Sequence, residues 1–317
     1  MLLKIKSYII LWIACLSGSI SVAQQDIAID TAHVDTIGIR VSSGFTAKDF
    51  IRMNKQDTSF YKAFKNLKLY PHLSENKVTI FNKKWEQIGK MNRNATHLSD
   101  GKQGWIDITE ESTDGKFYNR KGEHKYFTAE MYDKVFFEKG KFRVGNKVDS
   151  AYMQQEAENR SKTDKYYQQL KTFMFSPGLG VDGVPFIGHK LNIFDGEMVK
   201  YYDYLLEKTM FRDSLSCYKF TVQIKEGIRK EKVVITNLTT FYDRRTMKVI
   251  ARSYKLKQTT AMFSFDIQMF ILLGLKFNDY VPLEIKYNGE WDVPFKKPER
   301  IAFQMKCSEY VDITKVK

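Results

Sequence analysis

The apolar positions of the chain follow two periods, a helical one near the start and a strand-like one afterwards. Between Thr46 and Pro71, apolar side chains recur at helical spacing: Phe50, Met53, Phe60, Phe64 and Leu67. This spacing predicts one amphipathic helix that packs against a sheet or another helix. Thr46 followed by Asp49 predicts a capping box at its start, and Pro71 predicts its end.

From Lys77 onward, the pattern changes to short runs rich in β-branched and aromatic residues, separated by turns. Such runs predict strands joined as hairpins. In the first half the runs are 77–91 with a turn at 82–84, 104–108, 117–127 with a turn at Gly122, and the short aromatic pieces of 129–145. In the second half they are 202–210, 217–225, 233–242, 247–256, 261–275, 281–291 and 300–310. Because strands do not alternate with helices, we expect an antiparallel meander.

The middle of the chain interrupts this pattern. Residues 164–175 carry a helical pattern that Asp164 can cap, and 176–188 form the window richest in Gly and Pro. Two interpretations of this window stay open, a rim at the mouth of a cavity and a folded connector between two halves. We expect a leader at 24–45 and then one β-rich domain over 46–317, with possible sub-halves at 46–150 and 190–317.

Aromatic and apolar side chains indicate how the sheet is covered. The run from Met269 to Leu273 (MFILL) is apolar at every position, and only a strand covered on both faces holds such a run in water. Aromatic residues make up 14% of the chain, with 23 Phe and 18 Tyr, and large rings fill a sheet surface or line a cavity. A strongly curved antiparallel sheet with rings on its inner face leaves space for an acyl chain.

The N-terminus predicts export. Lys4 and Lys6 precede a short apolar core, YIILWIACL, and Ser21-Val22-Ala23 supplies small residues where a signal peptidase cleaves. The apolar run is shorter than the roughly 20 residues of a membrane span. We therefore expect residues 1–23 to be a signal peptide cleaved after Ala23, and the mature protein to be periplasmic and not integral to the membrane. Association with the outer membrane and lipidation of Cys15 stay open.

Cleavage also sets the charge of the mature chain. Without Lys4 and Lys6, the 51 basic residues fall to 49 against 37 acidic ones, a net charge of +12. The basic residues are scattered along strands and turns, which is typical of a solvated face and argues against a nucleic-acid partner. In an exported protein this charge favours an anionic envelope surface, such as lipid head groups or acidic glycans.

The sequence offers few groups for catalysis or for a cofactor. Its five histidines show no metal-ligand spacing, and no Gly-x-Ser-x-Gly elbow occurs, so we expect no cofactor, no metal and no catalytic residue. Paired carboxylates of a glycan hydrolase are brought together only by folding, so a hydrolase stays an alternative. Cys217 and Cys307 allow one disulfide in an oxidising compartment, with two buried free thiols as the alternative.

The C-terminal half also resembles a known superfamily. A strand with Cys217-Tyr218 is followed by a strand ending in Asp243-x-x-Thr246 and then by Val281-Pro282-x-x-Ile285. In this order the chain resembles the lipoprotein-carrier (lipoprotein-sorting) superfamily of the bacterial envelope, and phrases such as WDVPFKKPE are similar to exported proteins of Bacteroidota-type bacteria. The resemblance implies an incomplete β-barrel that wraps helices around an apolar, acyl-chain-shielding cavity.

Together these patterns predict an α+β fold, an incomplete β-barrel with packed helices, that binds a lipid, acyl chain or lipoprotein without catalysis. The residues expected to line its cavity are Phe50, Phe64, Tyr204, Phe220, Phe241, Phe263, Phe265, Phe270 and Trp291. Each lipid methylene buried there contributes about 0.8 kcal/mol, so a modest cavity suffices for binding. Two alternatives remain: an envelope interaction or scaffolding protein with a filled core, and a glycan or lipid hydrolase.

Overall fold

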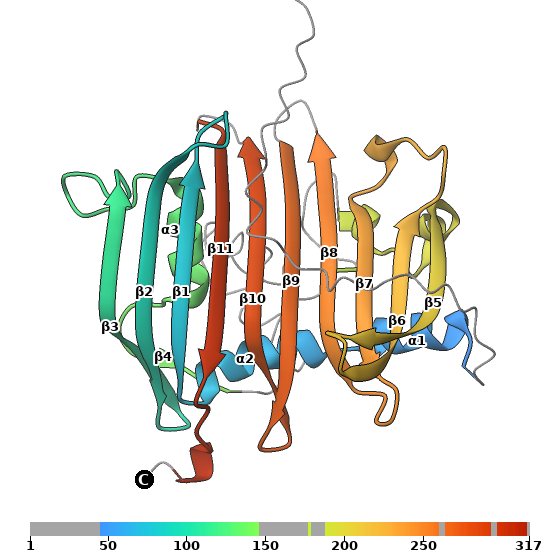
Figure 1. Cartoon of the computed structure of the whole chain (residues 1–317), viewed down its shortest axis with the longest axis horizontal. Coiled ribbons are helices and arrows are strands. Elements are labelled where there is room, and N and C mark those ends of the chain that lie inside the picture. Colours follow the sequence, from blue (N-terminus) through green and yellow to red (C-terminus); the bar gives the residue numbers. More distant parts are fainter. Residues whose placement is uncertain (1–44, 146–176, 179–187, 260–263, 293–296, 316–317) are drawn as a thin grey trace, which may run out of the picture.

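The computed structural model describes residues 45–145, 177–178, 188–259, 264–292 and 297–315. Eleven strands form one sheet in the order β4-β3-β2-β1-β11-β10-β9-β8-β7-β6-β5, and all neighbouring pairs are antiparallel. The second half of the chain runs as a meander from β5 to β11. β11 then pairs with β1, so that the first half continues the same sheet (Figure 1). The sheet stays open, and the predicted α+β fold with an incomplete barrel is confirmed.

The strand runs expected in the second half and at 77–91 are confirmed. The strands are β1 (His72–Phe81), β2 (Gln87–Ser99), β3 (Gln103–Gly115), β4 (Phe142–Arg143), β5 (Tyr202–Phe211), β6 (Leu215–Ile224), β7 (Ile235–Asp243), β8 (Val249–Thr259), β9 (Ser264–Lys276), β10 (Asp279–Asp292) and β11 (Glu299–Ser308). The helices are α1 (Ala47–Gln56), α2 (Ser59–Leu69) and α3 (Phe127–Phe136), with short 3₁₀ turns at Gly188–Leu191, Gly196–Tyr201, Lys230–Lys232 and Ile313–Lys315.

The single helix expected before Pro71 is in fact two helices. Its start is as predicted, because the amide and the hydroxyl of Thr46 both donate to the Asp49 carboxylate (2.9 and 2.8 Å). The break falls at Asp57, whose carboxylate accepts the Ser59 amide (2.9 Å) and pairs with Arg252 of β8 (2.8 Å). A short polar side chain that bonds its own backbone competes with helical hydrogen bonding, and here it ends α1.

Helix α3 corrects a second expectation, since 129–145 was expected to continue as strand-like pieces. Ala129, Tyr132 and Phe136 share its buried side at helical spacing, but the strand preference of aromatic residues obscured that period. The hairpin expected at 117–127 is reduced to a single bridge between Tyr118 and His124. The helical pattern at 164–175 and most of the Gly- and Pro-rich window lie outside the described residues.

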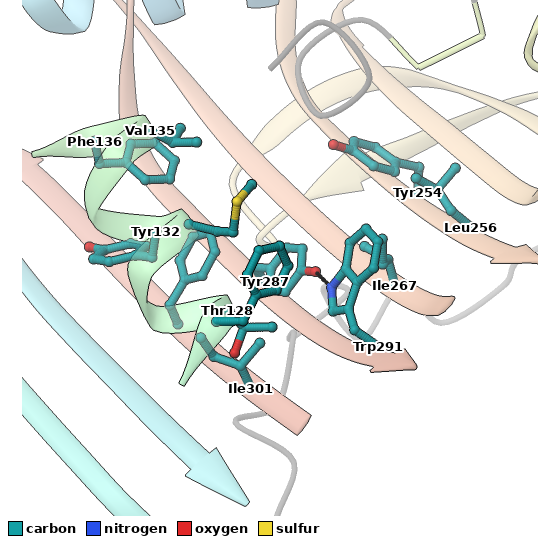
Figure 2. A pocket seen from close by; sticks show the side chains of 13 residues that line it. Thr128, Tyr132, Val135, Phe136, Tyr254, Leu256, Ile267, Tyr287, Trp291 and Ile301 are labelled. Carbon is teal, nitrogen blue, oxygen red and sulfur yellow. Dashed lines mark hydrogen bonds between the residues drawn. The ribbon is translucent and has the colours of Figure 1, made fainter. Parts of the chain in front are cut away.

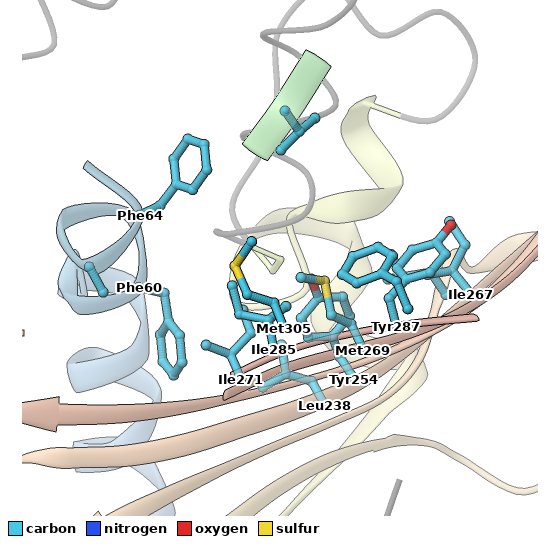
Figure 3. Close-up of a cluster of buried hydrophobic side chains, with 14 of the residues drawn as sticks. Phe60, Phe64, Leu238, Tyr254, Ile267, Met269, Ile271, Ile285, Tyr287 and Met305 are labelled. Atoms are coloured by element: carbon cyan, nitrogen blue, oxygen red, sulfur yellow. The ribbon is translucent and has the colours of Figure 1, made fainter. Parts of the chain in front are cut away.

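All three α-helices lie on one face of the sheet, and the main hydrophobic cluster packs between these helices and the sheet (Figures 1 and 3). Met269 and Ile271 of β9 belong to this cluster. Phe270 between them points to the other face and packs in a second cluster with Phe211, Cys217, Phe241 and Ala251. The expectation that this strand is covered on both faces is therefore confirmed. Arg212 lies over the rings of Phe211 and Phe270 and pairs with Glu284 of β10 (3.0 Å).

Candidate ligand-binding pocket

A pocket lies between α3 and the inner face of β8 to β11 (Figure 2). From α3 it is lined by Phe127, Thr128, Met131, Tyr132, Val135 and Phe136, and from the sheet by Tyr254, Leu256, Ile267, Tyr287, Trp291, Ile301 and Phe303. The void measures about 50 Å³, against roughly 300–1,000 Å³ for pockets that hold drug-sized ligands. Between the described residues of α3 and the sheet, the space expected from the sequence thus corresponds to a small void.

The polar side chains that line the pocket turn their polar atoms to protein partners. These hydrogen bonds run from Trp291 Nε1 to the Tyr287 hydroxyl (2.6 Å), from the Tyr132 hydroxyl to Asn76 Oδ1 (2.6 Å), from the Thr128 hydroxyl to Glu299 (2.8 Å) and from the Tyr254 hydroxyl to the Met269 sulfur (2.7 Å). Because these groups are satisfied, the wall that a ligand would meet is almost entirely hydrocarbon and aromatic ring.

A glycine determines where the central ring of the pocket lies. The ring of Tyr287 stacks on Phe303 with centroids 4.8 Å apart and planes 4° apart. It also covers Gly289, where an added Cβ would lie 2.3 Å from the Tyr287 hydroxyl oxygen. The missing side chain allows Tyr287 to lie along the strand and to accept the hydrogen bond of Trp291 (Figure 2).

Helix α3 is fixed at its N-terminus by a residue from β11. Tyr126, at the N-cap position, offers no side-chain cap. The Glu299 carboxylate replaces it by accepting the amides of Phe127 (3.0 Å) and Thr128 (2.9 Å). A carboxylate at a helix N-terminus both satisfies free amides and complements the helix dipole. The first turn of α3 is therefore held against the sheet beside the pocket.

An ion-pair network around one buried arginine holds the middle of α3. Arg93 of β2, only 3% exposed, pairs with Asp133 of α3 (2.7 Å) and Glu111 of β3 (2.6 Å), and His124 Nε2 lies 2.8 Å from Asp133. Burial alone would raise the pKa of Asp133, but the hydrogen bonds from His124 and Arg93 and the charge of Arg93 hold it below its usual value. This network explains the position of α3 and needs no ligand.

A serine–histidine pair bears on the hydrolase alternative. Ser74 Oγ lies 2.9 Å from His97 Nε2, and the side-chain amide of Asn76 donates to the same Ser74 oxygen (3.0 Å). Ser74 and His97 are only 2% and 4% exposed. A nucleophile must reach its substrate, and here the pair belongs to a buried network that continues through Asn76 to Tyr132. Among the described residues, no three His, Cys, Asp or Glu side chains are grouped to hold a metal ion.

His97 also stacks on His72 (4.2 Å between ring centres), and His72 stacks in turn on Tyr310 (4.7 Å). Burial lowers the pKa of His72 to about 4, against an opposing hydrogen bond with the Tyr70 carbonyl. Burial, together with the charges of His72 and Lys68, lowers the pKa of His97 well below its usual value. Both rings are therefore neutral in the folded protein at neutral pH.

Stability should fall as the pH drops from about 6.5 to about 4. In this window the unfolded chain protonates His72 at its ordinary pKa while the folded protein does not, so protons favour unfolding. The loss from His72 alone is on the order of 3 kcal/mol. Denaturant unfolding at pH 7 and pH 4.5 measures it. The variant H72F, which keeps a stacked ring, should show a weaker pH dependence, whereas H189Q at the exposed His189 should match the unmodified protein; equal slopes for all three would contradict the assignment.

The residues expected to line the cavity are distributed over three places. Trp291 lines the pocket, and the ring of Phe265 contacts it (5.4 Å). The packing around the main cluster, outside the pocket, includes Phe50, Phe64, Phe220 and Tyr204. The cluster on the other face holds Phe241 and Phe270, and Phe263 lies outside the described residues.

Half of the pocket residues that sequence reasoning missed come from α3, because that helix was not predicted, and the other half come from the sheet. On β10, Tyr287 could have been found from the same two-residue period that connects it through Gly289 to Trp291, since alternate residues of a strand share one face. On β11, Phe303 could have been found in the same way, because it lies two residues after Ile301 and shares its face of the sheet. Sequence alone gave no reason to join these strands to one helix.

Cys217 and Cys307 are free, buried thiols in this structure. They lie on β6 and β11, with four strands between them in the sheet. At about 4.8 Å per strand, this separation far exceeds the roughly 7 Å between Cα atoms that a disulfide spans. Burial raises the pKa of each thiol to about 12, so both remain protonated.

In the described part of the chain, no helix has the length and apolar character needed to cross a membrane. No protein-family model and no curated protein sequence matches this chain. Among solved structures, it is similar to an outer membrane lipoprotein-sorting protein domain from Vibrio parahaemolyticus (8% identity, TM-score 0.27, covering 86% of this chain and 92% of that one).

Two further solved structures are similar to this chain. One is a LolA superfamily protein from Nitrosomonas europaea (7% identity, TM-score 0.20, covering 82% of this chain and 98% of that one). The other is a DUF1329 family protein from Desulfovibrio piger ATCC 29098 (10% identity, TM-score 0.23, covering 82% and 93%). The superfamily that the sequence resembles is thus among the matched structures, and likenesses at these TM-scores leave the function to be argued from the chain's own geometry.

Proposed function

We propose that this protein binds an acyl chain, or a similarly apolar molecule, in the pocket between α3 and β8 to β11. The observation that supports this proposal is the lining itself, thirteen residues of which most are apolar and the others have partnered polar atoms. A polar ligand would lose its hydrogen bonds to water there without replacement, at a cost of roughly 1–3 kcal/mol per group. A methylene chain instead gains about 0.8 kcal/mol per group.

The small void implies that a ligand makes room for itself. Phe127, Met131 and Trp291 are the lining residues that are partly exposed, whereas most of the others are buried. Methionine is unbranched and adapts its shape easily, so Met131 can yield at little cost. Displacement of Trp291 breaks one hydrogen bond, to Tyr287. The ligand therefore enters beside these side chains, on the open side of the pocket.

The ligand belongs to the cell envelope in this proposal. The signal peptide expected at 1–23 directs the chain to the periplasm, where lipids and lipoprotein acyl chains need shielding from water. The proposed role is binding and not catalysis, because the described Ser–His pair is buried inside the fold. The small volume of this pocket, about 50 Å³, favours a second candidate, an envelope interaction protein that holds no ligand.

A pocket-filling variant separates these candidates. Leu256→Phe adds a ring at the buried pocket wall, and we expect it to weaken binding of a fluorescent fatty-acid probe about tenfold by removing the space of roughly two methylenes. The matched control is Leu206→Phe, the same exchange on β5 outside the pocket. Titration of the probe into each protein gives the dissociation constants. Identical affinities for both variants, or no binding to the unmodified protein, would overturn the proposal.

A further inference from the structure

Two turns of this protein share a sequence pattern and a hydrogen-bond pattern. The turn between β1 and β2 is Asn82-Lys-Lys-Trp-Glu86, and the turn after β3 is Asn119-Arg-Lys-Gly-Glu123. In each, the asparagine side-chain oxygen accepts the amides two and four residues later, at 2.8 and 3.1 Å in the first turn and 2.8 and 3.0 Å in the second. The asparagine side-chain amide donates to the glutamate (2.7 and 2.9 Å). The two turns are therefore structural equivalents.

They differ at the fourth position, where the backbone is left-handed in both. Gly122 has a φ of 76° and Trp85 has a φ of 63°. Glycine adopts this conformation freely, whereas a bulky aromatic residue is an outlier there. Trp85 is nevertheless 39% exposed, with its ring near Phe81 (5.7 Å) and the Arg300 guanidinium (4.7 Å). The turn does not need a tryptophan, because its equivalent forms with glycine.

Both turns also present two exposed cations in their second and third positions. These are Lys83, Lys84, Arg120 and Lys121, and no ion pair among the described residues uses any of them. The glutamate of each turn is occupied by its asparagine. Arg300, stacked on Trp85, pairs with Glu290 and donates to the Lys83 carbonyl. An exposed indole thus lies beside the Arg300 guanidinium in a turn that carries two exposed lysines.

The two turns lie at one edge of the sheet, here meaning the side formed by the ends of its strands and not an outer strand. The pocket residues Trp291 and Ile301 are found at the same edge. β1 and β3 both run antiparallel to β2, so their ends, and the turns that follow, share one edge (Figure 1). β10 ends and β11 begins at this same edge, with Trp291 and Ile301 close to those strand ends. Lys116, Lys125 and Lys297 are exposed there as well.

We propose that this edge docks on an anionic lipid bilayer, with Trp85 in the membrane interface and the four turn cations against lipid phosphates. Tryptophan suits that interface because its ring is apolar and its N–H is polar. Lysines and arginines near an anionic surface each contribute to the attraction. The inference rests on the proposed function, since docking at this edge brings the pocket to the source of its ligand.

The test uses the chain without its signal peptide and vesicles of phosphatidylglycerol with phosphatidylcholine, or of phosphatidylcholine alone. We expect binding to the anionic vesicles only, weakened by salt. Trp85→Gly copies the equivalent turn, keeps the fold and should weaken binding about tenfold or more. The double variant K83Q/K84Q should weaken it about 30-fold. The matched control is Phe277→Gly, because Phe277 is 40% exposed at a φ of 52° in the β9–β10 turn at the opposite edge, and its loss should leave binding unchanged.

Three outcomes would overturn docking: binding that W85G leaves intact, an equal loss in F277G, or equal binding to soluble dextran sulfate, which would indicate a polyanion site in place of a bilayer site. The pocket variant L256F distinguishes a failure of the docking proposal from a failure of the pocket proposal. It should bind vesicles normally while its affinity for the fatty-acid probe falls about tenfold. Probe binding without vesicle binding would refute docking alone, and vesicle binding without probe binding would refute the pocket alone.

Discussion

Replacement of Asp57 by alanine is expected to lower the free energy of unfolding by about 3–5 kcal/mol. Asp57 and Arg252 pair at 2.8 Å with side chains only 6% and 4% exposed. Arg252 also donates to Asn54 (3.1 Å) and Thr240 (3.0 Å), and these neutral partners cannot compensate its charge. The variant therefore leaves an uncompensated cation inside the protein and loosens the junction of α1 and α2. Urea unfolding followed by circular dichroism measures the loss.

The control for this prediction is an exposed pair of the same type. Lys257 and Asp266 pair at 2.6 Å with side chains 50% and 52% exposed, so Asp266→Ala should cost at most about 1 kcal/mol. The double variant D57L/R252M removes both charges together and should recover much of the stability. If D57A cost no more than D266A, the buried pair would not be what anchors these helices to the sheet.

Phe50→Ala should be comparably severe, at about 3–5 kcal/mol. The ring of Phe50 is fully buried and is in contact with the rings of Tyr218 (5.5 Å), Phe220 (5.8 Å) and Tyr242 (5.2 Å). Its removal leaves a cavity that these neighbours can only partly close. The measurement is again the free energy of unfolding, here compared with the change in fatty-acid-probe affinity, which should stay small because Phe50 does not line the pocket.

Phe45→Ala is the matched control, because Phe45 contacts the same Tyr218 ring (6.1 Å) but is 43% exposed. It should cost well under half as much as Phe50→Ala. A large loss of probe binding in F50A with little loss of stability would instead place Phe50 on the wall of a ligand cavity, as the sequence first led us to expect.

The strand half of the fold was predictable because strand period and turn chemistry agree. Asp243 illustrates this agreement: its carboxylate accepts the amides of Arg245 (2.8 Å) and Thr246 (2.7 Å), as the Asp-x-x-Thr pattern predicts. The helix break at Asp57 was missed although the Asp57 carboxylate that accepts the Ser59 amide is a local signal, and its second partner, Arg252, lies almost two hundred residues away. The pairing of β1 with β11 was beyond local pattern, since it joins strands from opposite ends of the chain.

The candidate site was less predictable than the fold. Trp291 was expected to line a cavity and does line the pocket, but α3, which forms the opposite wall, was hidden by its aromatic composition. Rings such as Phe270 could not be assigned to a face, because a strand buried on both sides has no polar alternation to mark its inner side. An aromatic residue suits a packed core and the wall of a ligand cavity equally well. The sequence therefore does not distinguish these two positions.

Native mass spectrometry of the protein purified from cell envelopes tests the central claim most directly. The account predicts a population whose mass exceeds that of the chain by one acyl lipid, and this population should be much smaller in Leu256→Phe and unchanged in Leu206→Phe. A single lipid-free mass for the unmodified protein, unchanged after incubation with fatty acid, would contradict it.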